Sequence, residues 1–176
     1  MMGRNHFELF SLPVSFDVDI DSLSARYQDL QRSIHPDNFT SATDREKRLS
    51  MQQASIANEA YQSLKDPLKR AQYLLSLNGI DVKSESNTVM DIAFLMQQME
   101  LREALDDTMD ATDPLAAVGI FSADVETRIK DLISQLQGHF NDNTKESLLQ
   151  AESLSLQLQF LYRLREEAED REEALL

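Results

Sequence analysis

The stretch DLQRSIHPDNFTSATDREKRL, residues 29–49, contains the corner that decides the fold. An apolar stripe with helical spacing leads into it, formed by Leu23, Tyr27, Leu30 and Ile34. Asp19 suits the N-cap of that helix, and Pro36 disfavours helical backbone at the residue before it. The helix should therefore end at His35, where an imidazole, a proline and the carboxylate of Asp37 follow one another. This corner could be a plain turn, a ligand site, or a surface that another protein recognises.

A second helical pattern follows the corner. Thr43 and Glu46 have the spacing of a capping box, and the apolar positions after them are Leu49, Ile56, Ala60 and Leu64. Asp66 followed by Pro67 predicts the start of a third helix, because aspartate is a good N-cap and proline is accommodated at the first helical position. Gly79 is placed to end that helix.

The composition favours an all-α protein. Hydrophobic residues make up 41% of the 176 residues, but only four Gly and four Pro occur, too few for the many turns of an all-β fold. The absence of Cys excludes disulfides and thiolate metal sites and fits a reducing compartment. The N-terminus does not resemble a signal peptide and no stretch reaches membrane-spanning length, so we expect a cytoplasmic protein without a membrane partner.

The charge is unevenly distributed and indicates two units. The whole chain has a net charge of −14, which argues against nucleic acid as a partner. Residues 1–77 contain 9 Lys and Arg against 10 Asp and Glu, whereas residues 78–176 contain 8 against 21. We therefore expect a first domain at 1–77, a junction at 78–87, and a second domain at 88–176.

Three helices are expected in the second domain. The first runs from Asn87 or Thr88 to about Asp107, the second over about 122–140, and the third over about 144–168. The segment DATDPLAAVGIF, residues 110–121, is expected to be a loop, and the acidic tail at 165–176 is expected to fray.

Two of these helices have more apolar surface than a three-helix core requires. On 88–107 one stripe is Met90, Phe94, Leu101 and Leu105, and the opposite one is Ile92, Leu95, Met96 and Met99. On the last helix one stripe is Leu154, Leu158 and Leu161, and the other is Leu149, Leu156 and Phe160. The surplus stripes could be buried by wide packing or exposed for a partner, and the sequence leaves open which stripe faces inward.

Catalysis by this chain is not indicated. It lacks a Gly-rich phosphate loop, a Cys nucleophile, and any Ser/His/Asp or paired-carboxylate arrangement of recognisable spacing. His6 and His139 have no metal-ligand spacing to His35. We therefore expect a protein that is not an enzyme and has neither a metal site nor a cofactor.

The corner and its surroundings resemble a J-domain. The resemblance rests on His35-Pro36-Asp37 between two amphipathic helices and on IANEAYQSLKDPLKRAQYLL, residues 56–75. The segments LLSLNGIDV at 74–82 and AFLMQQMELREALDD at 93–107, with an acidic helical unit directly after the J-domain, resemble the HscB co-chaperones of iron–sulfur cluster assembly in their bacterial form. The resemblance implies a J-domain helical hairpin joined to a three-helix bundle.

The same resemblance implies two partners. The corner would contact an HscA-type chaperone of the DnaK class and stimulate its ATPase; the implied contact residues are His35, Pro36, Asp37, Arg26 and Arg32. An IscU-type iron–sulfur scaffold protein would bind Leu95, Met96, Met99, Glu100, Arg102, Glu103 and Phe160. The basic face before the corner is thin, and Asn38 stands where many J-domains have Lys. A general J-protein with another client is the alternative.

Overall fold

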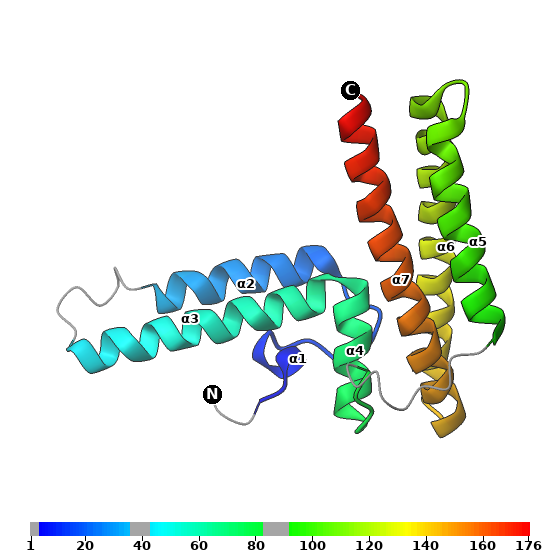
Figure 1. Ribbon diagram of the computed structural model, residues 1–176. Coiled ribbons are helices and arrows are strands. Elements are labelled where there is room, and N and C mark those ends of the chain that lie inside the picture. The colour runs from blue at the N-terminus through cyan, green and yellow to red at the C-terminus, as the bar shows by residue number, and fades with distance from the viewer. Residues whose placement is uncertain (1–3, 36–42, 83–91) are drawn as a thin grey trace. The chain divides into compact units, whose positions relative to one another are not determined.

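The computed structural model describes residues 4–35, 43–82 and 92–176, and in these ranges every regular element is a helix (Figure 1). The elements are α1 (His6–Leu9), α2 (Ile20–Ile34), α3 (Asp44–Lys65), α4 (Pro67–Leu77), α5 (Ile92–Asp107), the short 3₁₀ helix η2 (Thr108–Asp110), α6 (Pro114–Asp142) and α7 (Lys145–Leu175). The predicted all-α class is confirmed. The chain forms two compact units, Met1–Leu74 and Leu75–Leu176.

The first unit is built on the hairpin of α2 and α3. Leu23 and Ile34 of the predicted stripe are buried, and Tyr27 stacks on Tyr61 with ring centroids 4.1 Å apart. The carboxylate of Asp19 caps α2 as predicted, accepting hydrogen bonds from two backbone N–H groups. The buried stripe and the Tyr27–Tyr61 stacking hold α2 against α3.

One position of the predicted α3 stripe is wrong. Leu49 is 48% exposed, whereas Ser50, one residue further on, is buried together with Ala57 and Leu64. The spacing of apolar residues did not identify Ser50 as the inward-facing position, because serine is not apolar. The predicted capping box is confirmed, with the Thr43 side chain accepting from the Glu46 backbone N–H and the Glu46 side chain accepting from that of Thr43.

Aromatic contacts join α1 and α4 in the first unit. The ring of His6 stacks on Tyr73 at 4.1 Å, and burial lowers the pKa of the His6 imidazole. The Arg70 guanidinium lies 4.8 Å from the centre of the Phe16 ring. A positively charged side chain is thus packed on an aromatic face.

Both predicted ends of α4 are confirmed. The carboxylate of Asp66 accepts a hydrogen bond from the Lys69 backbone N–H at 2.9 Å, with Pro67 as the first helical residue. Gly79 has φ +79°, and its N–H donates to the carbonyl oxygen of Ser76 at 3.0 Å. A positive φ is the conformation that favours glycine after a helix.

The second unit contains α5, α6 and α7 as a three-helix bundle, as predicted (Figure 1). At the turn between α6 and α7, Asn143 adopts φ +49° and the Thr144 side chain accepts from the Ser147 backbone N–H. The hydroxyls of Ser147 and Thr144 donate to Asp142 and lower the pKa of its carboxyl. These bonds close the turn and set α7 beside α6.

The expected loop at 110–121 is largely wrong. α6 begins at Pro114, and the Asp113 carboxylate accepts a hydrogen bond from the Ala116 backbone N–H at 3.1 Å. This is the same aspartate–proline start as at Asp66 and Pro67. The short helix η2 includes only Asp110 of the expected loop. The start of the helix expected from Asn87 or Thr88 lies outside the described residues.

The acidic tail is helical rather than frayed, since α7 continues to Leu175. Its C-terminal part is fixed by contacts with α5, described below. In the parts of the chain that the structure describes, no helix combines the length and apolar character needed to span a bilayer.

Candidate partner-binding sites

The first candidate site is the corner after α2. The helix ends at Ile34, and His35 has extended backbone with φ −63° and ψ 135°, as expected for a residue before proline. Pro36 and Asp37 lie outside the described residues. His35 itself is exposed. Because the backbone of His35 is extended, α2 ends at the predicted position.

A buried hydrogen bond joins the two helices beside this corner. The Ser50 hydroxyl on α3 donates to the carbonyl oxygen of Ile34, and both residues are buried. The Ile34 carbonyl belongs to the last turn of α2, where carbonyl groups have no partner within the helix. Ser50 thus fixes the end of α2 against α3 and positions His35. This role of Ser50 was not predicted from the sequence.

The arginines expected near the corner have different surroundings. Arg26 donates to the carbonyl oxygens of Phe10 at 2.7 Å and Ser11 at 2.6 Å. Ser11 has φ +52°, so Arg26 supports an unusual turn within its own unit. Arg32 lies 3.5 Å from Asp29, and both side chains are more than two-thirds exposed. Of the two, Arg32 has the more accessible charge.

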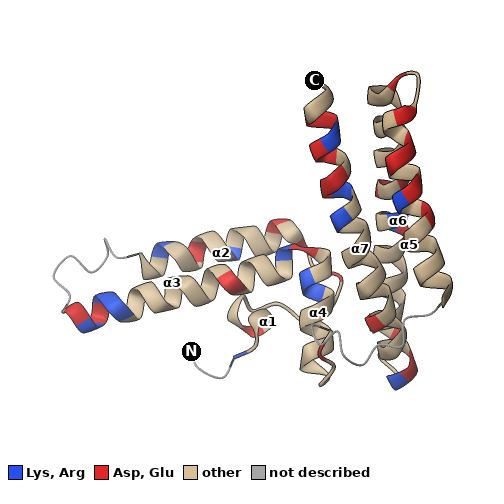
Figure 2. Ribbon diagram, viewed as in Figure 1, with Lys and Arg blue, Asp and Glu red and all other residues tan. Residues whose placement is uncertain are grey.

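Further basic residues, Arg45, Lys47 and Arg48, lie at the N-terminal end of α3, interspersed with acidic ones (Figure 2). All three are exposed. Together with Arg32, they place positive charge on the helices that flank the corner. An anionic surface of a partner would be attracted to this charge.

The second candidate site is the outer face of α5, which we define as Ile92, Leu95, Met96 and Met99. These side chains are 74%, 41%, 57% and 72% exposed, respectively. The opposite stripe faces the bundle: Leu101 and Leu105 are buried and Phe94 meets Phe160 edge-on. The structure thus settles which stripe faces inward.

Phe160 differs in burial from the other apolar residues of the implied scaffold site. Leu149, on the same stripe of the last helix, is exposed, but Phe160 is only 8% exposed. Its ring lies under α5, with centroids 6.2 Å from Phe94 and the Arg102 guanidinium 5.6 Å above it. Phe160 therefore supports α5 from below rather than extending the outer face. Phe160 is buried because Phe94 of α5 packs against its ring.

Charged residues surround the outer face. Glu100 and Glu103 are exposed, and Arg102 lies 3.4 Å from the carboxylate of Glu167 on α7. The C-terminal halves of α5 and α7 contain many further acidic residues (Figure 2). An apolar centre with a charged border is typical of protein interfaces.

An arginine of α7 fixes the C-terminal end of α5. Arg171 donates to the carbonyl oxygen of Leu105 at 2.7 Å and to the Asp106 carboxylate at 2.6 Å. The Leu105 carbonyl is in the last turn of α5, so the guanidinium also caps that helix. Neither Arg171 nor Glu167 was predicted from the sequence: Arg171 lies beyond the expected end of the helix at about 168, and the partner of Glu167 on α5 is distant in the sequence.

Comparisons with known proteins agree with this architecture. A family model described as the HSCB C-terminal oligomerisation domain matches residues 90–169. A protein from Shewanella woodyi named "Co-chaperone protein HscB homolog" is 42% identical over 171 residues, covering 97% of this chain and 98% of the relative. One from Pseudoalteromonas atlantica with the same name is 44% identical over 171 residues, with the same coverage.

Solved structures of related proteins share the fold. The chaperone HscB from Vibrio cholerae matches with a TM-score of 0.88 and 42% identity, covering 98% of this chain and 100% of that one. The human co-chaperone protein HscB matches with a TM-score of 0.86 and 28% identity, covering 97% and 83%. These matches place the chain among the helical co-chaperones. It belongs to the HscB co-chaperone family.

Proposed function

We propose that this co-chaperone binds an IscU-type iron–sulfur scaffold protein and delivers it to an HscA-type chaperone, whose ATPase it stimulates through His35, Pro36 and Asp37. The observation that supports this most is the outer face of α5. Four large apolar side chains are exposed there although a second stripe of the same helix supplies the core. Exposing that much apolar surface is unfavourable unless a partner covers it.

The outer face suits a folded partner with an apolar surface of its own. Two of its four members are methionines, whose flexible thioether chains adapt to the shape of a partner. Glu100, Arg102 and Glu103 at its border supply charges that can fix the orientation of the complex. Phe160 contributes indirectly, by holding α5 in place. We therefore assign scaffold binding chiefly to α5.

The corner suits the chaperone contact. Proline fixes its own φ near −65°, so less freedom is lost on binding. The carboxylate of Asp37 can form a charge-assisted and bidentate pair with an arginine of the partner. Ser50 and the capped start of α3 hold the two helix ends that flank the corner in the sequence. None of these residues needs to react, since the ATP is bound by the chaperone.

Delivery follows from having both sites in one chain. Because the corner and α5 belong to one chain, a scaffold bound to α5 is kept near the chaperone that the corner contacts. Its effective concentration there is higher than its concentration free in solution. Stimulated hydrolysis then closes the chaperone on the scaffold and promotes cluster transfer. The reaction is therefore catalysed by the partner, and this chain supplies recognition and proximity.

Scaffold binding is tested by replacing Leu95, Met96 and Met99 together with Ala and measuring scaffold affinity by calorimetry. We expect a loss of at least tenfold, about 1.4 kcal/mol, because the centre of an interface supplies most of its binding energy. Phe160 is left unchanged, since its loss would disturb α5 itself. Leu149→Ala, an exposed leucine on α7, is the matched control. Unchanged scaffold affinity of the triple variant refutes the assignment.

Chaperone stimulation is tested with Asp37→Ala and His35→Gln. Each variant should remain folded and bind scaffold normally, but should no longer raise the ATP hydrolysis rate of the HscA-type chaperone. Scaffold and wild-type protein together should raise that rate more than additively. Normal stimulation by either folded variant argues against the docking role. Equal binding of unrelated unfolded clients would instead indicate a general J-protein.

A further inference from the structure

Methionine has an uneven distribution between the core and the surface of this chain. Met51, Met96, Met99 and Met109 are all large apolar side chains on the surface, between 45% and 72% exposed. In the ranges that the structure describes, the core is built from Phe, Leu, Ile, Val and Ala and contains no methionine. A chemical change confined to these four methionines would therefore alter the surface and leave the described core intact.

Thioethers are the only sulfur groups of this chain, because the sequence contains seven Met and no Cys. A cysteine thiolate, where one is present, is the usual first target of an oxidant. Peroxides also convert a methionine thioether to a sulfoxide, and reductases reverse that reaction with electrons from a thiol. Oxidation of sulfur in this chain therefore falls on its methionines.

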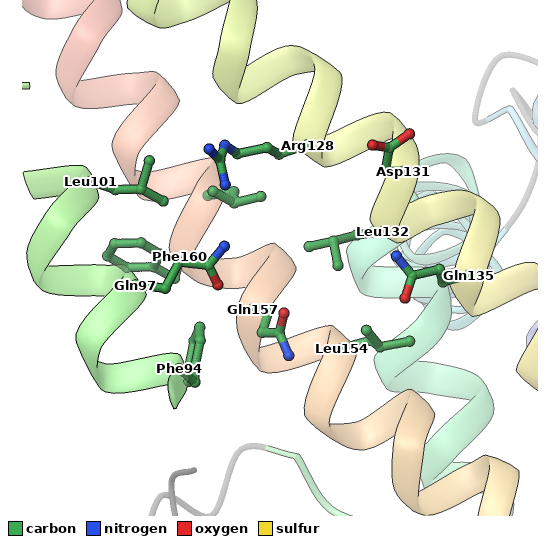
Figure 3. A pocket seen from close by; sticks show the side chains of 11 residues that line it. Phe94, Gln97, Leu101, Arg128, Asp131, Leu132, Gln135, Leu154, Gln157 and Phe160 are labelled. Carbon is green, nitrogen blue, oxygen red and sulfur yellow. The ribbon is translucent and has the colours of Figure 1, made fainter. Parts of the chain in front are cut away.

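Two of the four exposed methionines are neighbours on the outer face of α5. Met96 and Met99 are three residues apart, so their side chains lie side by side on the helix. Phe94, Gln97 and Leu101 of the same helix line a hollow together with side chains of α6 and α7 (Figure 3). At about 100° per residue, the two methionines lie on the opposite side of α5 from these three residues. An oxygen added to either sulfur would therefore lie on the side of α5 away from the bundle.

The charges around this pair favour an uncharged oxidant. Glu100 lies one helical turn from Met96 and Glu103 lies one turn from Met99, and both glutamates are exposed. The chain as a whole has a net charge of −14. Negative charge lowers the local concentration of anions but not that of neutral molecules. Hydrogen peroxide, which is small and uncharged at neutral pH, is the kind of oxidant that reaches these sulfur atoms without repulsion.

The reaction transfers one oxygen atom and two electrons. A lone pair of the methionine sulfur attacks one oxygen of hydrogen peroxide, and the O–O bond breaks. The second oxygen takes up the proton of the first and leaves as water, so that sulfur is oxidised and the peroxide is reduced. The product is a sulfoxide, which is polar where the thioether was apolar. Two of the four apolar side chains of the outer face would thereby become hydrogen-bond acceptors.

We propose that Met96 and Met99 form a reversible oxidation site, at which a neutral peroxide releases the scaffold from the outer face. This inference rests on the proposed function, because the scaffold is the partner assigned to that face. A sulfoxide oxygen buried against an apolar partner loses its water without gaining a hydrogen bond. Two such oxygens should weaken scaffold binding at least about tenfold. The fold should be retained, because both oxygens are added outside the core.

Treatment of the full-length chain with hydrogen peroxide, followed by removal of the peroxide, tests this inference. Peptide mass spectrometry locates each added oxygen, and calorimetry measures scaffold affinity before and after treatment. We expect sulfoxide at Met96 and Met99, at least about tenfold weaker scaffold binding, and a melting temperature within about 2 °C of that of the untreated protein. Methionine sulfoxide reductases of both stereospecificities should restore the affinity. The inference is overturned by the absence of sulfoxide at either position, by unchanged affinity, by a loss that accompanies unfolding, or by a loss that the reductases do not reverse.

Leucine variants locate the effect, since leucine is close to methionine in size and has no sulfur. Each variant is compared with its own untreated form, so its starting affinity does not enter the comparison. Met96→Leu combined with Met99→Leu should make the affinity insensitive to peroxide, and a loss that persists in this variant overturns the inference. Met51→Leu combined with Met109→Leu is the matched control and should keep the full loss.

Partly oxidised wild-type protein gives a test without substitutions. The loss of affinity should follow the sulfoxide content of Met96 and Met99, and a loss that follows Met51 or Met109 instead overturns the inference. If the untreated protein does not bind the scaffold, the proposed function fails and this inference fails with it. If the untreated protein binds and the fully oxidised protein binds equally well, only this inference fails.

Discussion

The inner and outer faces of α5 are similar in apolar content but differ in their surroundings. Leu101 and Leu105 on the inner face are 6% and 1% exposed, whereas Met96 and Met99 on the outer face are 57% and 72% exposed. Hydrophobicity alone therefore does not decide which face is buried. The two faces are distinguished by the polar residues beside them.

Two pairs between α5 and α7 set the orientation of α5. Arg102 reaches Glu167, and Asp106 receives Arg171. Arg102 and Asp106 are four residues apart, so they lie on the same flank of the helix, on either side of the direction of Leu95. If α5 were rotated to bury its methionines, these pairs would be broken. Glu103 and Asp106, which lie on the same side of the helix as Met96 and Met99 at about 100° per residue, would then turn toward the core. A charge buried without a partner is strongly unfavourable.

The largest expected effect is the difference in the free energy of unfolding between Leu105→Ala, on the inner face, and Met99→Ala, on the outer face. Leu105 is almost completely buried, so its truncation leaves a cavity and should lower the free energy of unfolding by about 2–5 kcal/mol. Met99 is mostly exposed, and its truncation should change that free energy by less than about 0.5 kcal/mol. Urea unfolding followed by circular dichroism measures both. Equal losses in the two variants would mean that the outer face is also part of the core.

The local parts of this arrangement are predictable from the sequence. The end of α2 before Pro36, the capping box at Thr43 and the αL glycine at Gly79 each depend on a few neighbouring residues. The start of α6 at Pro114 has the same kind of local signal, an aspartate followed by a proline, although a loop was expected at 110–121. Two apolar stripes on α5 were also evident.

The remaining features depend on neighbours that are distant in the sequence. Ser50 is buried because its hydroxyl meets the carbonyl of Ile34 across the hairpin. Phe160 is buried because Phe94 and Arg102 lie over it. Arg171 lies in a segment whose composition suggested a frayed tail. Helical periodicity contains no information about which distant partner will meet a residue, so the inner face of α5 could not be chosen in advance.

A smaller effect is expected from Arg171→Ala. The substitution removes two hydrogen bonds, of 2.7 Å and 2.6 Å, from a side chain that is 28% exposed. A loss of about 1–3 kcal/mol in unfolding free energy follows from hydrogen bonds to charged groups. Amide hydrogen exchange of the C-terminal half of α5 should increase. Arg163→Ala, an exposed arginine of the same helix, is the matched control. Unchanged α5 protection would show that the Phe94–Phe160 contact alone orients the helix.

The smallest effect is expected from Glu167→Gln, which removes the charge opposite Arg102 but leaves that arginine over Phe160. Both side chains are about half exposed and 3.4 Å apart, so the loss should be below about 1 kcal/mol and should vanish in 1 M NaCl, where charges are screened within about 3 Å. Asp124→Asn is the control, since its pair with Arg128 lies within α6. Urea unfolding at low and high salt measures both. A salt-independent loss in Glu167→Gln alone would mean that shape rather than charge fixes this flank, and α5 would then be oriented mainly by its aromatic contact.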